Sequence, residues 1–403
     1  MGQYIDEKKV ETLLRKLVSI ESPYFHEDEI MDYAHKWLKD HDLDAEIHTY
    51  FEPKETKFHG KNVVGIMDSG KEGPVVYLGG HLDTVNLCNG WTKPPYEGIV
   101  EDGYLYGVGA VDMKSGSCAI LLAMAEFAAK NKNAFKGKVI YHFVSDEEGP
   151  YGLGTVYIIH DQIHNVAKDV DFAIITEPSA SFTGLPHPCI CLGARGGYNY
   201  TIRVYGKSAH AATPEMGVNA LTDASKIVCQ LENLVPAEDE KLGRAAMCVI
   251  DVRGKGGACS VPDYAEIEVF RHCVRGETME TIQKEVEGAI KKAQIKSKAE
   301  IAFRPSPVEG FDGGFLPYCI DENDDNLKAL EKTVEKVCGE KANLSYFESI
   351  GDFNHIGGKL GIPTVLIGAD GDNFHSANER VDLKSVLETT RIIYEFLVET
   401  LAE

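Results

Sequence analysis

The segment VVYLGGHLD, residues 75–83, is a short apolar run that leads directly into His81 and Asp83. Three later segments repeat this pattern of an apolar run followed by a turn or polar side chains: YHFVSDEE (141–148), AIITEP (173–178) and TVLIG (364–368). Val- and Ile-rich runs that alternate with helical segments are typical of parallel strands covered by helices on both faces. The sequence therefore predicts an α/β fold with a largely parallel sheet.

Helical segments lie around these runs, because apolar residues recur every three or four positions. The predicted helices cover residues 6–20, 27–41, 114–129, 155–164 and 326–337, and the last one begins at Leu383. Between residues 193 and 304 the order changes to strand, helix, strand, strand, helix, strand, which is the ferredoxin-like order. We therefore expect an inserted domain at 193–304, with a catalytic domain formed by residues 1–192 and 305–403.

The charge balance excludes several classes of partner. The chain has 403 residues with 41 Lys and Arg against 63 Asp and Glu, for a formal net charge of −22. Such a surface repels nucleic acids and anionic lipids, so neither is an expected partner. The sequence contains no apolar run of about 18 residues, and its start, MGQYIDEKKVETLL, does not resemble a signal peptide. We expect a cytoplasmic protein.

The ten cysteines are scattered along the chain, which predicts reduced thiols rather than a disulfide framework. Cys118 and Cys229 lie in apolar periodic segments and are expected to pack as small hydrophobic residues. Only Cys189-Ile-Cys191 has a spacing that suggests a metal site, and a second pair of ligands is missing nearby.

Polar residues at the ends of the apolar runs predict a metal site at one edge of the sheet, where ligands bind in parallel sheets. The candidates are His81, Asp83, Asp112, Glu147, Glu148, Glu177 and His375. Imidazole and carboxylate ligands together suit zinc, and a pair of ions needs a bridging carboxylate, for which Asp112 is the natural choice. Of the adjacent Glu147 and Glu148, one can bind metal while the other acts as a base. Asp83 can orient the imidazole of His81.

The sequence resembles the zinc metallopeptidases that include aminoacylase, acetylornithine deacetylase, succinyl-diaminopimelate desuccinylase and bacterial glutamate carboxypeptidases. The matching stretches are GGHLDTV (79–85), GYLYGVGAVDMKSG (103–116), SDEEG (145–149), TEPS (176–179), GARGGYNYTIRVYGKSAHAATPEMGVNAL (193–221) and FHSANERV (374–381). They occur in the family's order over nearly the whole chain. The resemblance implies hydrolysis of an amide bond in an N-acyl amino acid or short peptide.

The resemblance also implies a role for each site residue. One divalent ion would be bound by His81, Asp112 and Glu177, and the other by Asp112, Glu148 and His375; zinc is expected, with cobalt or manganese as alternatives. Glu147 resembles the general base, and Asp83 the residue that orients His81. In the inserted domain, His210 resembles a histidine that polarises the scissile carbonyl, often across a dimer interface, and Arg271 an arginine that holds the substrate carboxylate. A homodimer through the inserted domain is expected.

The chain departs from the family pattern at three positions: Val108 where Arg is frequent, Cys259 where Asn is frequent, and Asn378 where Asp is frequent. A thiol is a poor replacement for an amide as a hydrogen-bond donor to an oxyanion. The departures leave the metal ligands intact and affect the expected contacts with substrate.

Alternative interpretations remain for single residues and for the whole chain. Asp112 could cap the helix that follows it, and His355, near Asp352, could be structural. Gly107-x-Gly109 suggests a dinucleotide-binding oxidoreductase, but the third glycine of that motif is missing. An aminopeptidase or dipeptidase of the same family and a non-catalytic metal-binding relative are further alternatives. Glu177 resembles the deacylase and carboxypeptidase branch, because the peptidase branches usually have aspartate there.

Overall fold

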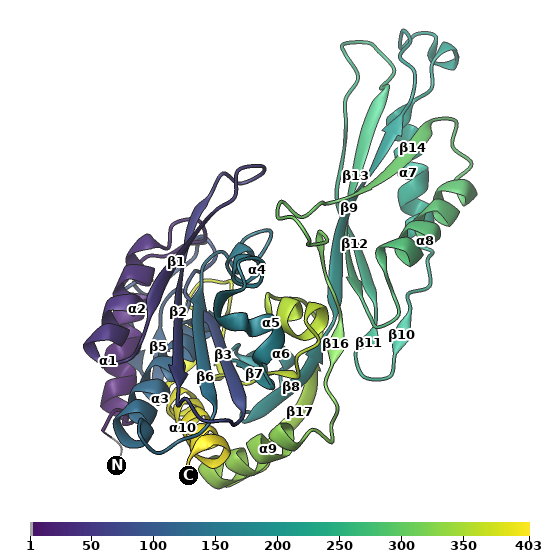
Figure 1. Ribbon diagram of the computed structural model, residues 1–403. Helices are drawn as coiled ribbons and strands as arrows, with labels where there is room; N and C mark the ends of the chain where they lie inside the picture. Colours follow the sequence, from purple (N-terminus) through teal and green to yellow (C-terminus); the bar gives the residue numbers. More distant parts are fainter. Residues whose placement is uncertain (1–2) are drawn as a thin grey trace.

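In the computed structural model, which describes residues 3–403, a nine-stranded sheet forms the centre of the larger part of the molecule (Figure 1). Its strand order is β1-β2-β6-β3-β7-β18-β8-β16, with β17 paired to β8. The bounds are β1 Glu46–Phe51, β2 His59–Asp68, β3 Val75–His81, β6 Lys138–Val144, β7 Phe172–Ile175, β8 Cys189–Ala194, β16 Tyr318–Cys319, β17 Asn343–Phe347 and β18 Thr364–Leu366. The strands β6, β3, β7 and β18 are parallel, whereas β1, β2 and β16 pair antiparallel at the edges. The predicted parallel sheet is therefore its centre, and the whole sheet is mixed.

Helices pack on this sheet through their apolar faces. They are α1 (Glu7–Val18), α2 (Asp28–Asp40), α3 (Ser115–Asn131), α4 (Leu153–His160), α5 (Val166–Asp169), α6 (Ser179–Thr183), α9 (Asp325–Cys338) and α10 (Leu383–Leu401). Helix α3 is buried from Ser115 to Ala128, because it packs on β3 and is itself covered by α1 and α10. The predicted helix at 155–164 is α4, which begins and ends earlier.

A second sheet lies in the elongated part that projects from the larger one in Figure 1. Its strands run in the order β12-β13-β9-β14, all antiparallel, with β15 (Gly314–Phe315) added to β9. The elements are β9 Gly196–Tyr205, α7 Ala220–Leu231, β12 Ala246–Gly254, β13 Tyr264–Cys273, α8 Met279–Lys292 and β14 Lys298–Phe303. This order is ferredoxin-like, and α7 and α8 enclose a separate core with the sheet. The exact domain boundaries stay a prediction.

Side-chain caps explain why several helices begin where they do. Asp6 accepts a hydrogen bond from the N–H of Lys9 at the start of α1, and Asn219 accepts one from Thr222 in α7. Thr278 and Thr281 form a reciprocal capping box at α8. These caps satisfy N–H groups that a helix leaves unpaired in its first turn.

A small sheet joins two distant segments that reach the edge of the large sheet. Its strand order is β19-β20-β5-β4, with bounds β19 Gly371–Asp372, β20 Arg380–Asp382, β5 Tyr104–Tyr106 and β4 Ile99–Glu101. The turn before α3 and the loop between β19 and β20 are thereby held side by side. A further short pair is formed by β10 (Glu238–Asp239) and β11 (Gly243–Arg244).

The predicted free thiols are found, but only one of the two cysteines expected to be buried is buried. Within residues 3–403 all ten cysteines are free. Cys118 is buried as predicted, but Cys229 is exposed because it lies on the outer face of α7. Across that same range, none of the helices is both long and apolar enough to cross a membrane.

Candidate functional site

The candidate ligands meet because adjacent parallel strands end at the same edge of the sheet. His81 is the last residue of β3, Glu147 and Glu148 follow β6, and Glu177 follows β7. Strand β3 lies between β6 and β7, so its two neighbours deliver carboxylates to either side of His81. The small sheet brings the remaining two candidates, Asp112 from the turn before α3 and His375 from the loop between β19 and β20.

Asp112 lies between the two histidines, and each of its oxygens faces one of them. Its Oδ1 is 3.4 Å from Nε2 of His81, and its Oδ2 is 3.2 Å from Nε2 of His375. Glu177 lies on the His81 side, with Oε1 3.7 Å from Nε2 of His81. Glu148 lies on the other side, with Oε1 2.8 Å from Nε2 of His375. Asp112 thus contacts both histidines, and the ligand atoms that lie within 4.8 Å of one another form two groups that share His81, one with Asp112 and Glu148 and one with Glu147 and Glu177.

Two buried ligand atoms in this cluster have no hydrogen-bond partner among the described residues, namely Nε2 of His81 and Oε2 of Glu177. Leaving a buried polar atom unpaired costs free energy, roughly 1–3 kcal/mol for each group. Imidazole nitrogen and carboxylate oxygen are also the atoms that borderline metals bind. The residues present therefore fit a metal ion.

The pKa values in the cluster reflect its crowded carboxylates. Burial raises the pKa of Glu147 and of Glu177 well above their ordinary value. Burial disfavours the charged form of His81, but Asp112 and Asp83 outweigh this and hold the pKa of His81 well above its ordinary value. Hydrogen bonds to Asp112 and Glu148 raise the pKa of His375 to about 11. The cluster favours positive charge between its carboxylates.

The adjacent residues Glu147 and Glu148 have different surroundings. Glu148 contacts His375, whereas Oε1 of Glu147 accepts a hydrogen bond of 3.0 Å from the backbone N–H of Asp352. The other oxygen of Glu147 lies 3.9 Å from Nε2 of His81. Glu147 therefore borders the cluster with one oxygen fixed and the other turned toward it.

His81 is oriented through its other ring nitrogen. Nδ1 lies 3.0 Å from the backbone carbonyl of Asp83 and 3.5 Å from the carboxylate oxygen Oδ1 of the same residue. A hydrogen on Nδ1 leaves the lone pair of Nε2 free for a metal. Asp83 was predicted to orient His81, and its carbonyl makes a closer contact with the ring than its carboxylate does. The carboxylate also accepts the N–H of Glu148, at 2.9 Å.

A cavity of about 360 Å³ opens beside this cluster. One wall consists of Asp112, Glu147, Glu148, Glu177 and His375. The lining also contains four aromatic side chains, Phe182, Phe347, Phe353 and Phe374, together with Glu348, Ser349 and Ile350. The rings of Phe182 and Phe347 stack with their centroids 4.5 Å apart. The cavity therefore combines the candidate metal ligands with aromatic surface.

Two predicted residues of the second sheet are not brought to this cavity. His210 is exposed and pairs through its backbone with Ser260. Arg271 is buried in β13, where its guanidinium forms ion pairs with Glu277 and Glu285. Because these carboxylates already neutralise Arg271, its predicted contact with substrate rests on the resemblance alone.

The turn that carries Asp112 requires a glycine at position 109. Gly109 has φ 72°, and a Cβ at this position would lie 2.5 Å from Cγ2 of Thr84, so a larger residue is strained there. Helix α3 begins at Ser115, and in the described range it has no side-chain cap at its start. Asp112 is therefore not the cap of α3.

One residue important for this turn was missed by the sequence argument. Glu379 is buried, and its carboxylate accepts the backbone N–H groups of Gly109, Val111 and Asp112 at 2.8, 3.0 and 3.1 Å. It lies in the quoted segment FHSANERV, four residues after His375, so the motif contained it without indicating its partners.

Comparison with known proteins places the chain among metallopeptidases. The sequence profile of peptidase family M20/M25/M40 matches residues 77–399. A succinyl-diaminopimelate desuccinylase of Sulfurimonas denitrificans is 26% identical over 392 residues, 96% of this chain and 98% of the relative. One from Rickettsia bellii strain OSU 85-389 is 27% identical over 396 residues, 97% of this chain and 96% of the relative.

Solved structures with the same fold cover the chain almost completely. Aminopeptidase PepT of Bacillus cereus matches with a TM-score of 0.77 and 21% identity over 98% of this chain and 99% of that chain. The metallo-carboxypeptidase Sso-CP2 of Sulfolobus solfataricus gives 0.75 and 18%, over 96% and 98%. YXEP of Bacillus subtilis, described as a dinuclear metal-binding peptidase, gives 0.67 and 17%, over 98% and 97%.

Proposed function

The chain belongs to peptidase family M20/M25/M40 and is a metal-dependent amidohydrolase, and we propose that it uses two divalent ions to cleave the amide bond of an N-acyl amino acid or short peptide. The observation that carries this proposal is the position of Asp112, whose two oxygens face His81 and His375 separately. A carboxylate between two imidazoles suits a pair of ions that share one bridging ligand.

The proposed ligands divide into two sets. His81, Asp112 and Glu177 hold one ion, and Asp112, Glu148 and His375 hold the other. The distances within each set support this division, because Glu177 is near His81 and Glu148 is near His375. We propose zinc, since imidazole and carboxylate together suit it; cobalt and manganese bind the same ligand types.

Two divalent ions held by these residues would supply Lewis-acid chemistry, which polarises a carbonyl and makes water a stronger acid. Glu147 acts as the general base: it takes a proton from the attacking water and returns it to the departing amine. The N–H of Asp352 fixes one oxygen of Glu147, so the other carries the proton. Asp83 supports His81 through its carbonyl and through its carboxylate.

The substrate class is supported by the cavity and by the relatives. The aromatic surface favours an apolar or extended acyl part, while the metal-binding wall receives the scissile amide. The curated relatives are named succinyl-diaminopimelate desuccinylases, which supports a deacylase. An aminopeptidase or dipeptidase of this family is the second candidate, and the similarity to aminopeptidase PepT supports only the shared fold.

We further propose that the active enzyme is a homodimer in which His210 of one chain completes the site of the other. His210 is exposed and contacts none of the candidate metal ligands of its own chain in residues 3–403. The edge strand β12 also exposes apolar side chains, with Ile250 52% and Val252 40% exposed, which suits a protein interface. The role of Arg271 and a cytoplasmic location stay predictions.

The substitution Glu147→Gln tests the proposed mechanism. It keeps the size of the side chain but removes the base, so the metal content should equal that of the wild type while turnover falls about 10²–10⁴-fold. The measurements are elemental analysis and hydrolysis of a panel of N-acyl amino acids and dipeptides. The exposed Glu280→Gln on α8 is the control and should match the wild type. Full turnover by Glu147→Gln would refute the assignment.

A further inference from the structure

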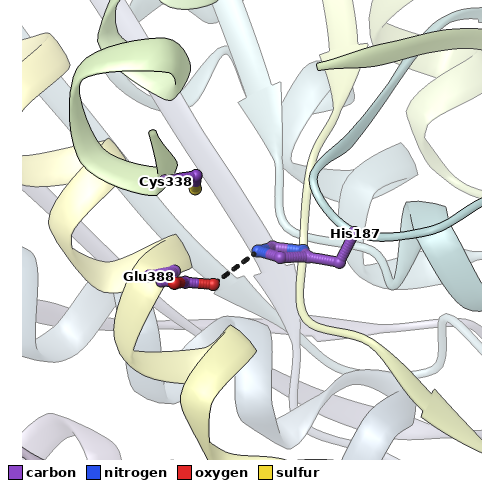
Figure 2. Close-up of side chains that lie close together, drawn as sticks. All are labelled: His187, Cys338 and Glu388. Atoms are coloured by element: carbon purple, nitrogen blue, oxygen red, sulfur yellow. Dashed lines mark ion pairs between the residues drawn. The ribbon is translucent and has the colours of Figure 1, made fainter. Parts of the chain in front are cut away.

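A second group of metal-ligand side chains lies away from the catalytic cavity. His187 is in the loop before β8, Cys338 is the last residue of α9, and Glu388 lies in α10. A nitrogen of His187, the sulfur of Cys338 and a carboxylate oxygen of Glu388 all lie within 4.8 Å of one another. Figure 2 shows the three side chains approaching one another from separate segments. None of these three residues lines the catalytic cavity formed within residues 3–403.

The imidazole of His187 is buried without a hydrogen bond in the described part of the chain, and its one charged contact is Glu388. Its side chain is 7% exposed, and neither Nδ1 nor Nε2 forms a hydrogen bond within the described part of the chain. Nε2 points toward Glu388 and lies 3.5 Å from its Oε2, which is long for a hydrogen bond (Figure 2). Buried polar atoms are rarely left without a hydrogen bond, because they lose their hydration on burial.

Glu388 has one oxygen directed away from His187 and one directed toward it. Oε1 lies 3.3 Å from Nζ of Lys384, an ion pair along α10, and this leaves Oε2 facing the imidazole. The Glu388 side chain is 13% exposed. The lysine therefore partly neutralises Glu388 without occupying the oxygen on the side of His187.

We propose that His187, Cys338 and Glu388 bind a zinc ion that cross-links the loop before β8 to α9 and α10. Nitrogen, sulfur and oxygen ligands are all found at tetrahedral zinc sites, and thiolate excludes magnesium and calcium as good occupants. The three side chains leave a fourth position for water. Burial raises the pKa of Cys338 to about 11, so zinc displaces the thiol proton to solvent when it binds.

The proposed ion has a structural role. Helix α9 packs against α10, and the ligands lie at the end of α9, where the helix is followed by Gly339 at φ 78°. Holding that end to α10 and to the start of β8 opposes local opening of three segments that are far apart in sequence. This inference does not depend on the catalytic function proposed above, because it uses different residues.

Cobalt loading of the full-length protein tests the site. The protein is stripped with a chelator, dialysed and titrated with cobalt(II) while its absorption spectrum is recorded. Cobalt bound by a thiolate gives a sulfur-to-metal charge-transfer band in the near ultraviolet. The proposed catalytic ligands contain only nitrogen and oxygen, so the band reports on a thiolate ligand outside the catalytic site, and substitution of Cys338 tests which thiol it is.

The wild type should show this band with one thiolate-bound cobalt per chain, and Cys338→Ser should lose it. Cys319→Ser is the matched control and should keep the band, because Cys319 is also half-buried and burial also raises its pKa to about 11. His187→Gln keeps the thiol and should weaken the band, which separates coordination from binding to a thiol alone.

Zinc content gives an independent readout. After reconstitution with zinc, Cys338→Ser should hold one ion fewer per chain than the wild type and the Cys319→Ser control. A wild type without the cobalt–thiolate band would overturn the proposal and leave His187 and Glu388 as a buried ion pair. A band that persists in Cys338→Ser would overturn it as well, since another thiol would then be the ligand.

Discussion

Glu379 allows a direct test of how the turn with Asp112 is held. Its carboxylate is buried and accepts the N–H groups of Gly109, Val111 and Asp112. Oε1 serves Val111 and Asp112, and Oε2 serves Gly109. The substitution Glu379→Ala removes all three contacts and leaves the turn free to move. Because Asp112 is the proposed bridging ligand, both ions should then bind more weakly.

The contacts give the size of the effect. A buried N–H without an acceptor costs about 1–3 kcal/mol, so Glu379→Ala should lower the free energy of unfolding by at least about 3 kcal/mol. Glu379→Gln can keep its oxygen on Val111 and Asp112 and lose only the contact with Gly109, at about 1–3 kcal/mol. Residues that position metal ligands typically change metal affinity about 10–100-fold. We expect that loss for Glu379→Ala and a smaller one for Glu379→Gln.

Glu52 provides a matched control elsewhere in the molecule. It is also buried, and its carboxylate accepts the backbone N–H groups of Lys54, Glu55 and Thr56 in the connection between β1 and β2. Glu52→Ala should therefore lower the free energy of unfolding by an amount similar to that for Glu379→Ala, while the metal affinity stays that of the wild type.

The assay is titration of chelator-stripped protein with zinc in competition with a chromophoric chelator, alongside urea unfolding of the metal-free form. If Glu379→Ala and Glu52→Ala lose the same stability and both bind zinc like the wild type, Glu379 does not position the metal ligands. Weaker zinc binding in Glu52→Ala would show that general destabilisation explains the effect.

Three further outcomes are expected. His375→Ala should hold one ion fewer per chain than the wild type, because His375 belongs to only one of the two proposed catalytic ligand sets, and elemental analysis measures this; an unchanged metal content would contradict its assignment. A mixture of His210→Ala and Glu147→Gln, each nearly inactive alone, should regain activity after subunit exchange, since one hybrid site is then intact; no recovery would argue against a shared site. Burial lowers the pKa of His355 from 6.5 to about 4, so the folded state keeps this imidazole neutral. Below about pH 6.5 the unfolded chain takes up a proton at this imidazole and the folded protein does not. The free energy of unfolding therefore falls by about 3 kcal/mol as the pH drops from about 6.5 to about 4. In urea unfolding, His355→Gln should lose this part of the pH dependence, and an unchanged dependence would contradict the burial argument.

The elements predicted most accurately from sequence are those whose signals are local. Helix α10 begins at Leu383, as predicted from its apolar periodicity, and Asp382 caps its first turn. The edge strand β1 and the internal strand β8, which pairs parallel with β17 and antiparallel with β16, were not predicted. The direction in which a strand pairs depends on contacts with distant segments, and the six residues of each strand carry no record of those contacts.

The same contrast between local signals and long-range contacts applies to the site. Carboxylates and histidines at strand ends were recognisable, because the sheet geometry places such ends together. The closer contact of His81 with the carbonyl of Asp83 was not, since a backbone atom leaves no signature in the residue type. Likewise, His187, Cys338 and Glu388 belong to separate segments and form no spacing motif. The Cys189-Ile-Cys191 spacing suggested metal, yet both of these cysteines lie inside the buried strand β8.

The proposed metal ligands and His210 lie in different parts of the chain, so metal binding and turnover should respond to different substitutions. Every proposed metal ligand lies either before residue 193 or after residue 304, and pairing of β20 with β5 joins these two parts next to the site. The inserted segment contributes none of the proposed ligands, but it carries His210. Metal affinity should therefore depend on the residues before 193 and after 304, Glu379 among them, whereas turnover should also require the second sheet and, in the proposed homodimer, a second copy of the chain. Substitutions in the inserted segment are thus expected to lower activity at unchanged metal content, and substitutions around Asp112 are expected to lower both.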